Sequence, residues 1–156
     1  KFKIGDIEVN PFPIPHDAAN PCGFNIFKDN KKLSIATDIG NMTLDVLKCL
    51  EESEFILLES NYDLEVLKHS PYPYNLKRRI AGPHGHLSNE LAGKTISHLL
   101  KSGLKNAMLG HLSKESNFPE LAYQTVVDEL IYNNYDENSI SLSVASRDEH
   151  SKIIQI

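Results

Sequence analysis

The sequence has no apolar run that approaches the length of a membrane span, and no charged-then-apolar leader opens it. It contains 2 cysteines in 156 residues, Cys22 and Cys49, and they do not form a Cys-x-x-Cys pair. Cysteine usage this sparse excludes a disulfide framework and favours a reducing compartment. We therefore expect a cytoplasmic protein that does not contact a membrane.

An excess of basic residues is also lacking, since 16 Lys and Arg stand against 21 Asp and Glu, a formal net charge of −5. This balance excludes a global basic footprint for nucleic acid, so any such contact has to come from a local patch. A nucleic-acid substrate stays open, because bound metal ions add positive charge that the count omits. The length predicts a single domain, residues 1–156.

Apolar patterning predicts an α/β domain. The first part alternates around turn signals, which is typical of hairpins, and the later part alternates short apolar runs with amphipathic helical periods. We expect strands at 2–4, 7–14, 23–27, 33–36, 55–58, 107–109 and 140–144, and helices at 43–50, 88–102 and from Pro119 with Ile131 turned inward, plus a polar helical stretch over 63–80 broken by prolines. The fold class is therefore a layered α/β domain with a mixed β-sheet and flanking helices.

Four polar segments follow apolar strands or precede a capped helix. They are Pro15–Ala18, Thr37–Gly40, Pro83–Ser88 and Gly110–Ser113. Strand ends and helix starts are where sites form in layered α/β proteins. Each segment alone has a simpler reading: a histidine that hydrogen-bonds in its loop, an aspartate that forms a turn, or a serine that only caps a helix. Their joint order along the chain carries the information.

That order resembles the metallo-β-lactamase superfamily and, within it, the YycJ/WalJ-like branch. The matching stretches are HDAANPCGF at 16–24, ATDIG at 36–40, LESNYD at 58–63, GHLSN at 85–89 and LGHLSKESN at 109–117. They follow the order of that branch and cover nearly the whole chain. Tyr62 stands where a histidine is common in the branch, so we assign no role to that position.

The resemblance implies a role for each polar segment. His16 corresponds to a histidine of the first metal site, Asp38 to the carboxylate that bridges two divalent ions, Zn²⁺ or Mn²⁺, and His111 to a ligand of the second. His86 corresponds to a catalytic histidine that does not bind metal but assists the developing oxyanion. Glu59 is expected to orient a histidine from behind. Imidazole and carboxylate groups suit either metal.

The superfamily's HxHxDH motif is absent, because the one HxH, at 84–86, is followed by Leu87-Ser88-Asn89. The resemblance therefore implies the C-terminal half of an αββα sandwich, with an incomplete ligand set and little activity by itself. It also implies an uncovered apolar sheet face. We expect the missing N-terminal half or a second copy to cover a face built by Phe24, Ile26, Leu33, Ile35, Ile56 and Leu58.

The function implied for the intact protein is metal-dependent hydrolysis of phosphodiesters, of the DNA exonuclease kind. Two alternatives stay open: a hydrolase of small esters, thioesters or cyclic nucleotides, and a non-catalytic partner-binding module. The Lys77–Arg79 cluster beside Tyr72 and Tyr74 bears on this choice. It could contact a backbone phosphate, or it could be no more than a solvated helix face.

Overall fold

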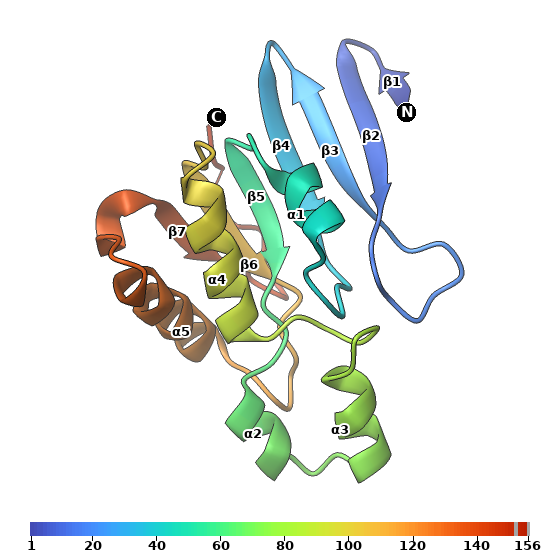
Figure 1. Ribbon diagram of the computed structural model, residues 1–156, viewed down its shortest axis with the longest axis vertical. Coiled ribbons are helices and arrows are strands. Elements are labelled where there is room, and N and C mark those ends of the chain that lie inside the picture. Colours follow the sequence, from blue (N-terminus) through green and yellow to red (C-terminus); the bar gives the residue numbers. More distant parts are fainter. Residues whose placement is uncertain (152, 156) are drawn as a thin grey trace.

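A computed structural model describes residues 1–151 and 153–155. Its centre is one seven-stranded sheet in which the strands lie side by side in sequence order (Figure 1). The strands are β1 (Phe2–Ile4), β2 (Ile7–Pro13), β3 (Cys22–Lys28), β4 (Lys31–Ala36), β5 (Phe55–Glu59), β6 (Asn106–Gly110) and β7 (Ser141–Val144). The helices are α1 (Leu44–Leu50), α2 (Leu64–His69), α3 (Tyr74–Ile80), α4 (Asn89–Leu100) and α5 (Pro119–Tyr132), with a 3₁₀ turn η1 (Glu137–Ser139).

The sheet is mixed, as the sequence predicts. Strands β1 to β4 pair antiparallel, with two-residue turns between β1 and β2 and between β3 and β4 and a longer loop, residues 14–21, between β2 and β3. Strands β4 to β7 pair parallel through helical crossovers. Asp29 and Asn30 both take positive φ, of 50° and 63°, in the turn between β3 and β4. The parallel half brings the carboxyl ends of β4, β5 and β6 to one edge of the sheet, which is the lower edge in Figure 1.

Helices α1, α4 and α5 cover one face of the sheet (Figure 1). Thr43 and Ser88 cap α1 and α4 as predicted, since their hydroxyls accept hydrogen bonds from the amides of Val46 and Leu91. Ile131, expected to face inward, is instead 56% exposed near the end of α5. The core under these helices is built by Phe12, Ala36, Val46, Leu50, Ile56, Leu58, Ile96, Leu99, Ala107, Leu109, Val126 and Leu130, among others.

The opposite face of the sheet carries a second set of apolar side chains, which are only half-buried. The strand register corrects the expected membership of this face. Because Ile35 pairs with Leu57 and not with Ile56, side-chain alternation turns Ile56 and Leu58 into the helix-covered core. The half-buried face is formed by Phe24, Ile26, Leu33, Ile35, Leu57 and Met108.

The polar stretch over 63–80 forms two short helices, α2 and α3, which project beyond the lower edge of the sheet (Figure 1). Asp63 caps α2, and the prolines expected to interrupt the stretch lie in the connection to α3 and at its start. Within the described part of the chain, no helix has both the length and the apolar character needed to span a bilayer.

Candidate metal centre

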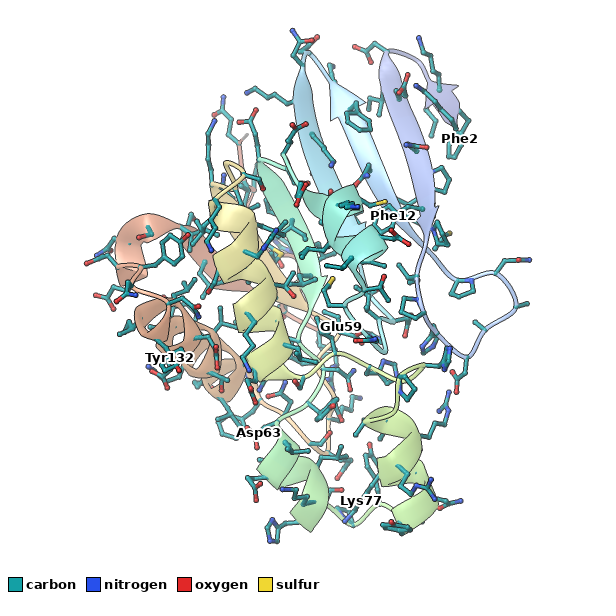
Figure 2. All side chains as sticks on the ribbon, in the orientation of Figure 1. Phe2, Phe12, Glu59, Asp63, Lys77 and Tyr132 are labelled. Carbon is teal, nitrogen blue, oxygen red and sulfur yellow. The ribbon has the colours of Figure 1, made fainter. Side chains whose placement is uncertain are left out.

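Three neighbouring parallel strands deliver polar side chains to one edge of the sheet. Asp38 lies two residues after β4, Glu59 is the last residue of β5, and His111 directly follows β6. His86 arrives from the segment before α4, and His16 from the loop after β2. The carboxyl ends of parallel strands are where α/β proteins place their sites, and Figure 2 shows Glu59 at this edge.

Two of these residues have a positive φ, a backbone conformation that residues other than glycine rarely adopt. Asp38 has φ of 59° and His111 has φ of 57°. A positive φ at a non-glycine residue costs free energy and persists where the surroundings demand it, often at functional sites. Here it bends the chain sharply at the ends of β4 and β6.

The loops that carry His16, Asp38 and His86 are joined through their backbones. The amide of Gly40 donates to the carbonyl of Pro15 over 2.8 Å, and that of Asp17 donates to the carbonyl of His84 over 3.0 Å. Gly40 permits this approach, because a Cβ there would lie 2.4 Å from the nitrogen of Gly85. The glycine in the Asp38 segment therefore serves close packing of two site loops.

Glu59 is fully buried, and every hydrogen bond it accepts involves the site. Its Oε1 bonds Nδ1 of His111 at 2.6 Å and Nδ1 of His86 at 2.8 Å. Its Oε2 accepts from the backbone amides of Ile39 at 2.7 Å and Leu87 at 3.1 Å. One carboxylate thus fixes two imidazoles and the backbone next to Asp38 and His86, which is a second-layer arrangement typical of metal sites.

The pKa shifts agree with an ionised Glu59. Burial alone would raise the pKa of its carboxyl, but the hydrogen bonds from His111, His86 and the amide of Ile39 outweigh burial and lower it. The hydrogen bond to Glu59 raises the pKa of His111. A carboxylate can only accept, so Nδ1 of both histidines carries the proton, and both Nε2 atoms are left as bases or metal ligands.

Asp38 forms the outer part of the site, with its side chain 41% exposed. Its Oδ1 lies 3.5 Å from Nε2 of His16, 3.6 Å from Nδ1 of His86 and 3.7 Å from Nδ1 of His111. Two ligands with metal bonds of about 2.0–2.2 Å lie at most about 4.4 Å apart, so an oxygen of Asp38 and a nitrogen of His16 fit a shared ion. Nδ1 of His16 bonds the carbonyl of Gly85 at 2.9 Å, which orients its Nε2 toward the carboxylate.

The structure therefore gathers all four predicted site residues, His16, Asp38, His86 and His111, around one point. One donor atom from each of Asp38, Glu59, His86 and His111 lies within 4.8 Å of the others, so four polar groups from separate segments of the chain meet at this edge of the sheet. The rings form a row, with centroids 5.2 Å apart from His16 to His86 and 5.3 Å from His86 to His111. Because His86 and His111 contact Glu59 in the same way, their separate roles remain predictions.

Sequence reasoning missed two contacts that support the site. The amide group of Asn61 donates to the carbonyl of His111 over 2.6 Å and so holds its strained backbone. Arg79 donates two hydrogen bonds, of 2.5 and 2.9 Å, to the carboxylate of Asp17. These bonds connect α3 to the loop of His16, and they lower the pKa of Asp17. Arg79, grouped by sequence with the phosphate-binding candidates, is thus engaged within the chain. Pairs so distant in sequence leave no local signal.

No family model matches the chain. Curated proteins similar to it include the exodeoxyribonuclease WalJ of Streptococcus pneumoniae, 38% identical over 127 residues, and the exodeoxyribonuclease YycJ of Bacillus anthracis, 36% identical over 123 residues. The matches cover 81% and 79% of this chain but 47% of each relative, so the chain spans about half the length of the proteins it matches.

Solved structures that superpose on the chain identify its fold. The metallo-β-lactamase fold protein YhfI of Bacillus subtilis superposes with a TM-score of 0.61 at 11% identity, over 92% of this chain and 48% of that one. The chain has the metallo-β-lactamase fold. Human tRNase Z, short form, superposes with a TM-score of 0.52 at 20% identity, covering 72% of this chain and 38% of the enzyme. The predicted resemblance to the YycJ/WalJ-like branch is confirmed.

Proposed function

We propose that residues 1–156 are the second half of a metal-dependent phosphodiesterase of the metallo-β-lactamase fold that acts on DNA. The observation that carries this proposal is the row of three histidines around the oxygen of Asp38, two of them fixed by Glu59. The names of WalJ and YycJ, both exodeoxyribonucleases, favour DNA as the substrate. The full-length polypeptide that includes this chain is called the parent protein below.

The donor set fits divalent metal ions, Zn²⁺ or Mn²⁺. His16 and His111 each offer an imidazole nitrogen, and Asp38 offers two carboxylate oxygens, enough to contact two ions at once. When bound, a pair of such ions supplies Lewis acidity toward a phosphate oxygen and a reactive nucleophile at neutral pH. Three protein ligands are too few for two ions, so we propose that the preceding half of the parent protein supplies the others.

His86 is proposed to handle a proton rather than a metal ion. Its Nδ1–H donates to the buried carboxylate of Glu59, so a positive charge on its ring is stabilised when Nε2 takes up a proton. A protonated Nε2 can then donate to the oxygen that leaves the phosphate. The bond to Glu59 also fixes the ring plane, which keeps Nε2 directed away from the carboxylate.

The half-buried sheet face is proposed to pack against the missing half of the parent protein, with a second copy of the chain as the alternative. A contiguous apolar face on one side of a sheet is costly to leave in water, at roughly 25 cal/mol per Å². Sedimentation of residues 1–156 tests this: the chain should self-associate or bind the separately produced first half. A chain that stays monomeric when dilute and does not bind the first half would contradict the proposed interface.

The proposed activity is tested with the metal-loaded parent protein, offered end-labelled DNA, a model phosphodiester, a thioester and a lactone. We expect DNA and the phosphodiester to be cleaved, and chelation of the metal to abolish cleavage. Cleavage of the thioester or lactone with both phosphodiesters left intact would move the assignment to small-molecule hydrolysis. No turnover of any substrate by the metal-loaded protein would favour a partner-binding module.

A further inference from the structure

A cavity of about 700 Å³ opens directly beside His111. Two segments line it: residues 111–114 and 117–119, from the end of β6 to the first residue of α5, and residues 145–148, which follow β7. Cavities of about 300–1,000 Å³ are typical of small-molecule and nucleotide sites. Since His111 belongs to both the cavity wall and the candidate metal centre, a group held in this cavity lies next to the proposed reaction point.

We propose that this cavity binds the nucleotide next to the scissile phosphate, with Phe118 stacking on the base and Arg147 and Lys114 contacting the backbone. The inference rests on the proposed phosphodiesterase function and adds the residues that recognise its substrate. Neither Lys114 nor Arg147 stands out in the sequence, because 33 positions separate them (147 − 114). The fold brings both to one cavity.

Phe118 is suited to stacking because it is exposed and firmly placed. Phe118 is 50% exposed and lies on the cavity wall. Its backbone amide donates to the Asn117 side-chain oxygen over 3.0 Å, and the Asn117 amide group donates to the carbonyl of Ser60 over 2.9 Å. The base platform is thereby anchored to the end of β5, and any base can stack on it because every base has a π-face.

The charges of the cavity favour an anion. Its lining includes two cationic side chains, Lys114 and Arg147, and one carboxylate, Asp148. A guanidinium of Arg147 donates to the carbonyl of Leu112, in the loop that follows His111. Because a guanidinium has five N–H donors, this bond fixes the group and leaves it able to bind a phosphate. A neutral ester substrate would gain little from this pair of cations.

The experiment measures binding and cleavage of fluorescein-labelled single-stranded DNA by the metal-loaded parent protein. The variants are Phe118→Ala, Phe118→Leu, Arg147→Gln and Lys114→Gln. Tyr132→Leu is the matched aromatic control, because Tyr132 is 83% exposed at the opposite end of α5 (Figure 2). Lys101→Gln is the matched charge control, at the carboxyl end of α4. Binding is followed by anisotropy across a series of salt concentrations.

Both Phe118 variants should weaken binding about 5- to 150-fold and act mainly on KM. Arg147→Gln and Lys114→Gln should each reduce the slope of log affinity against log salt by about 0.7 to 0.9, a change that a merely structural role would not produce. The two controls should stay within about twofold of the wild type. Metal content should be unchanged, and Phe118→Leu keeps the apolar bulk should the alanine variant fail to fold.

Wild-type affinity and salt slope in Phe118→Leu and Arg147→Gln, in a parent protein that still cleaves DNA, would overturn the cavity assignment alone. A parent protein that neither binds nor cleaves DNA would overturn the proposed function together with this inference. Measurement of the wild-type parent protein alone therefore distinguishes failure of the proposed function from failure of the cavity assignment.

Discussion

The two carboxylates of the site, Glu59 and Asp38, differ in burial and in the hydrogen bonds that they accept. Glu59, the inner carboxylate, is fully buried and accepts four hydrogen bonds from within the chain. Asp38, the outer carboxylate, is 41% exposed and faces three histidines at 3.5 Å or more. A carboxylate saturated by protein donors builds structure, whereas a partly exposed carboxylate without such donors is available to a ligand. The two therefore predict opposite consequences for stability and for metal binding.

The largest expected effect on stability belongs to the inner carboxylate. Glu59→Ala leaves the amides of Ile39 and Leu87, both fully buried, without an acceptor and frees both imidazoles. Breaking a buried charged network by removing one partner costs about 3–5 kcal/mol. Urea unfolding of the metal-free parent protein measures this loss, with the exposed Glu115→Ala as control. A loss below about 1 kcal/mol would mean that Glu59 does not organise the site.

Asp38→Asn should reverse that pattern. Asparagine tolerates positive φ, and the side chain is partly exposed, so the free energy of unfolding should change by about 0.5 kcal/mol or less. Loss of a residue that only hydrogen-bonds a metal ligand typically lowers metal affinity about 10–100-fold. Asp38→Asn should lower it further, since the charge of a ligand itself is lost. Calorimetric titration with Zn²⁺ and Mn²⁺ measures it. Unchanged affinity for both ions would remove Asp38 from the ligand set.

Asn61→Ala should lower metal affinity, but by less than Asp38→Asn does. It removes the hydrogen bond to the His111 carbonyl and leaves the imidazole and its bond to Glu59 in place. We expect metal affinity to fall about 10-fold, because a ligand held less firmly pays more ordering entropy on binding. The surface variant Asn138→Ala serves as control. An affinity loss as large as that of Asp38→Asn would mean that Asn61 acts more directly than the structure indicates.

The sequence predicted the strands, the helix caps and the gathering of His16, Asp38, His86 and His111, because strand ends and family order carry that information locally. It did not predict the register that turns Ile56 and Leu58 away from the half-buried face, since a one-residue shift flips a strand and leaves its composition unchanged. Nor did it predict the engagement of Arg79 by Asp17, which depends on how α3 sits against the loop after β2.

The geometry alone does not divide the metal ligand from the proton donor, because Glu59 holds His86 and His111 alike. The resemblance to the YycJ/WalJ-like branch separates them, assigning metal binding to His111 and proton transfer to His86.

Elemental analysis of metal per protein, made beside a DNA cleavage assay, separates the two roles in the parent protein and its His86→Ala and His111→Ala variants. His86→Ala should keep nearly all its metal and lose about 10²–10⁴-fold in turnover, the usual contribution of general acid–base catalysis. His111→Ala should lose metal and turnover together. Equal loss of metal from both variants would make His86 a metal ligand and remove its role in proton transfer.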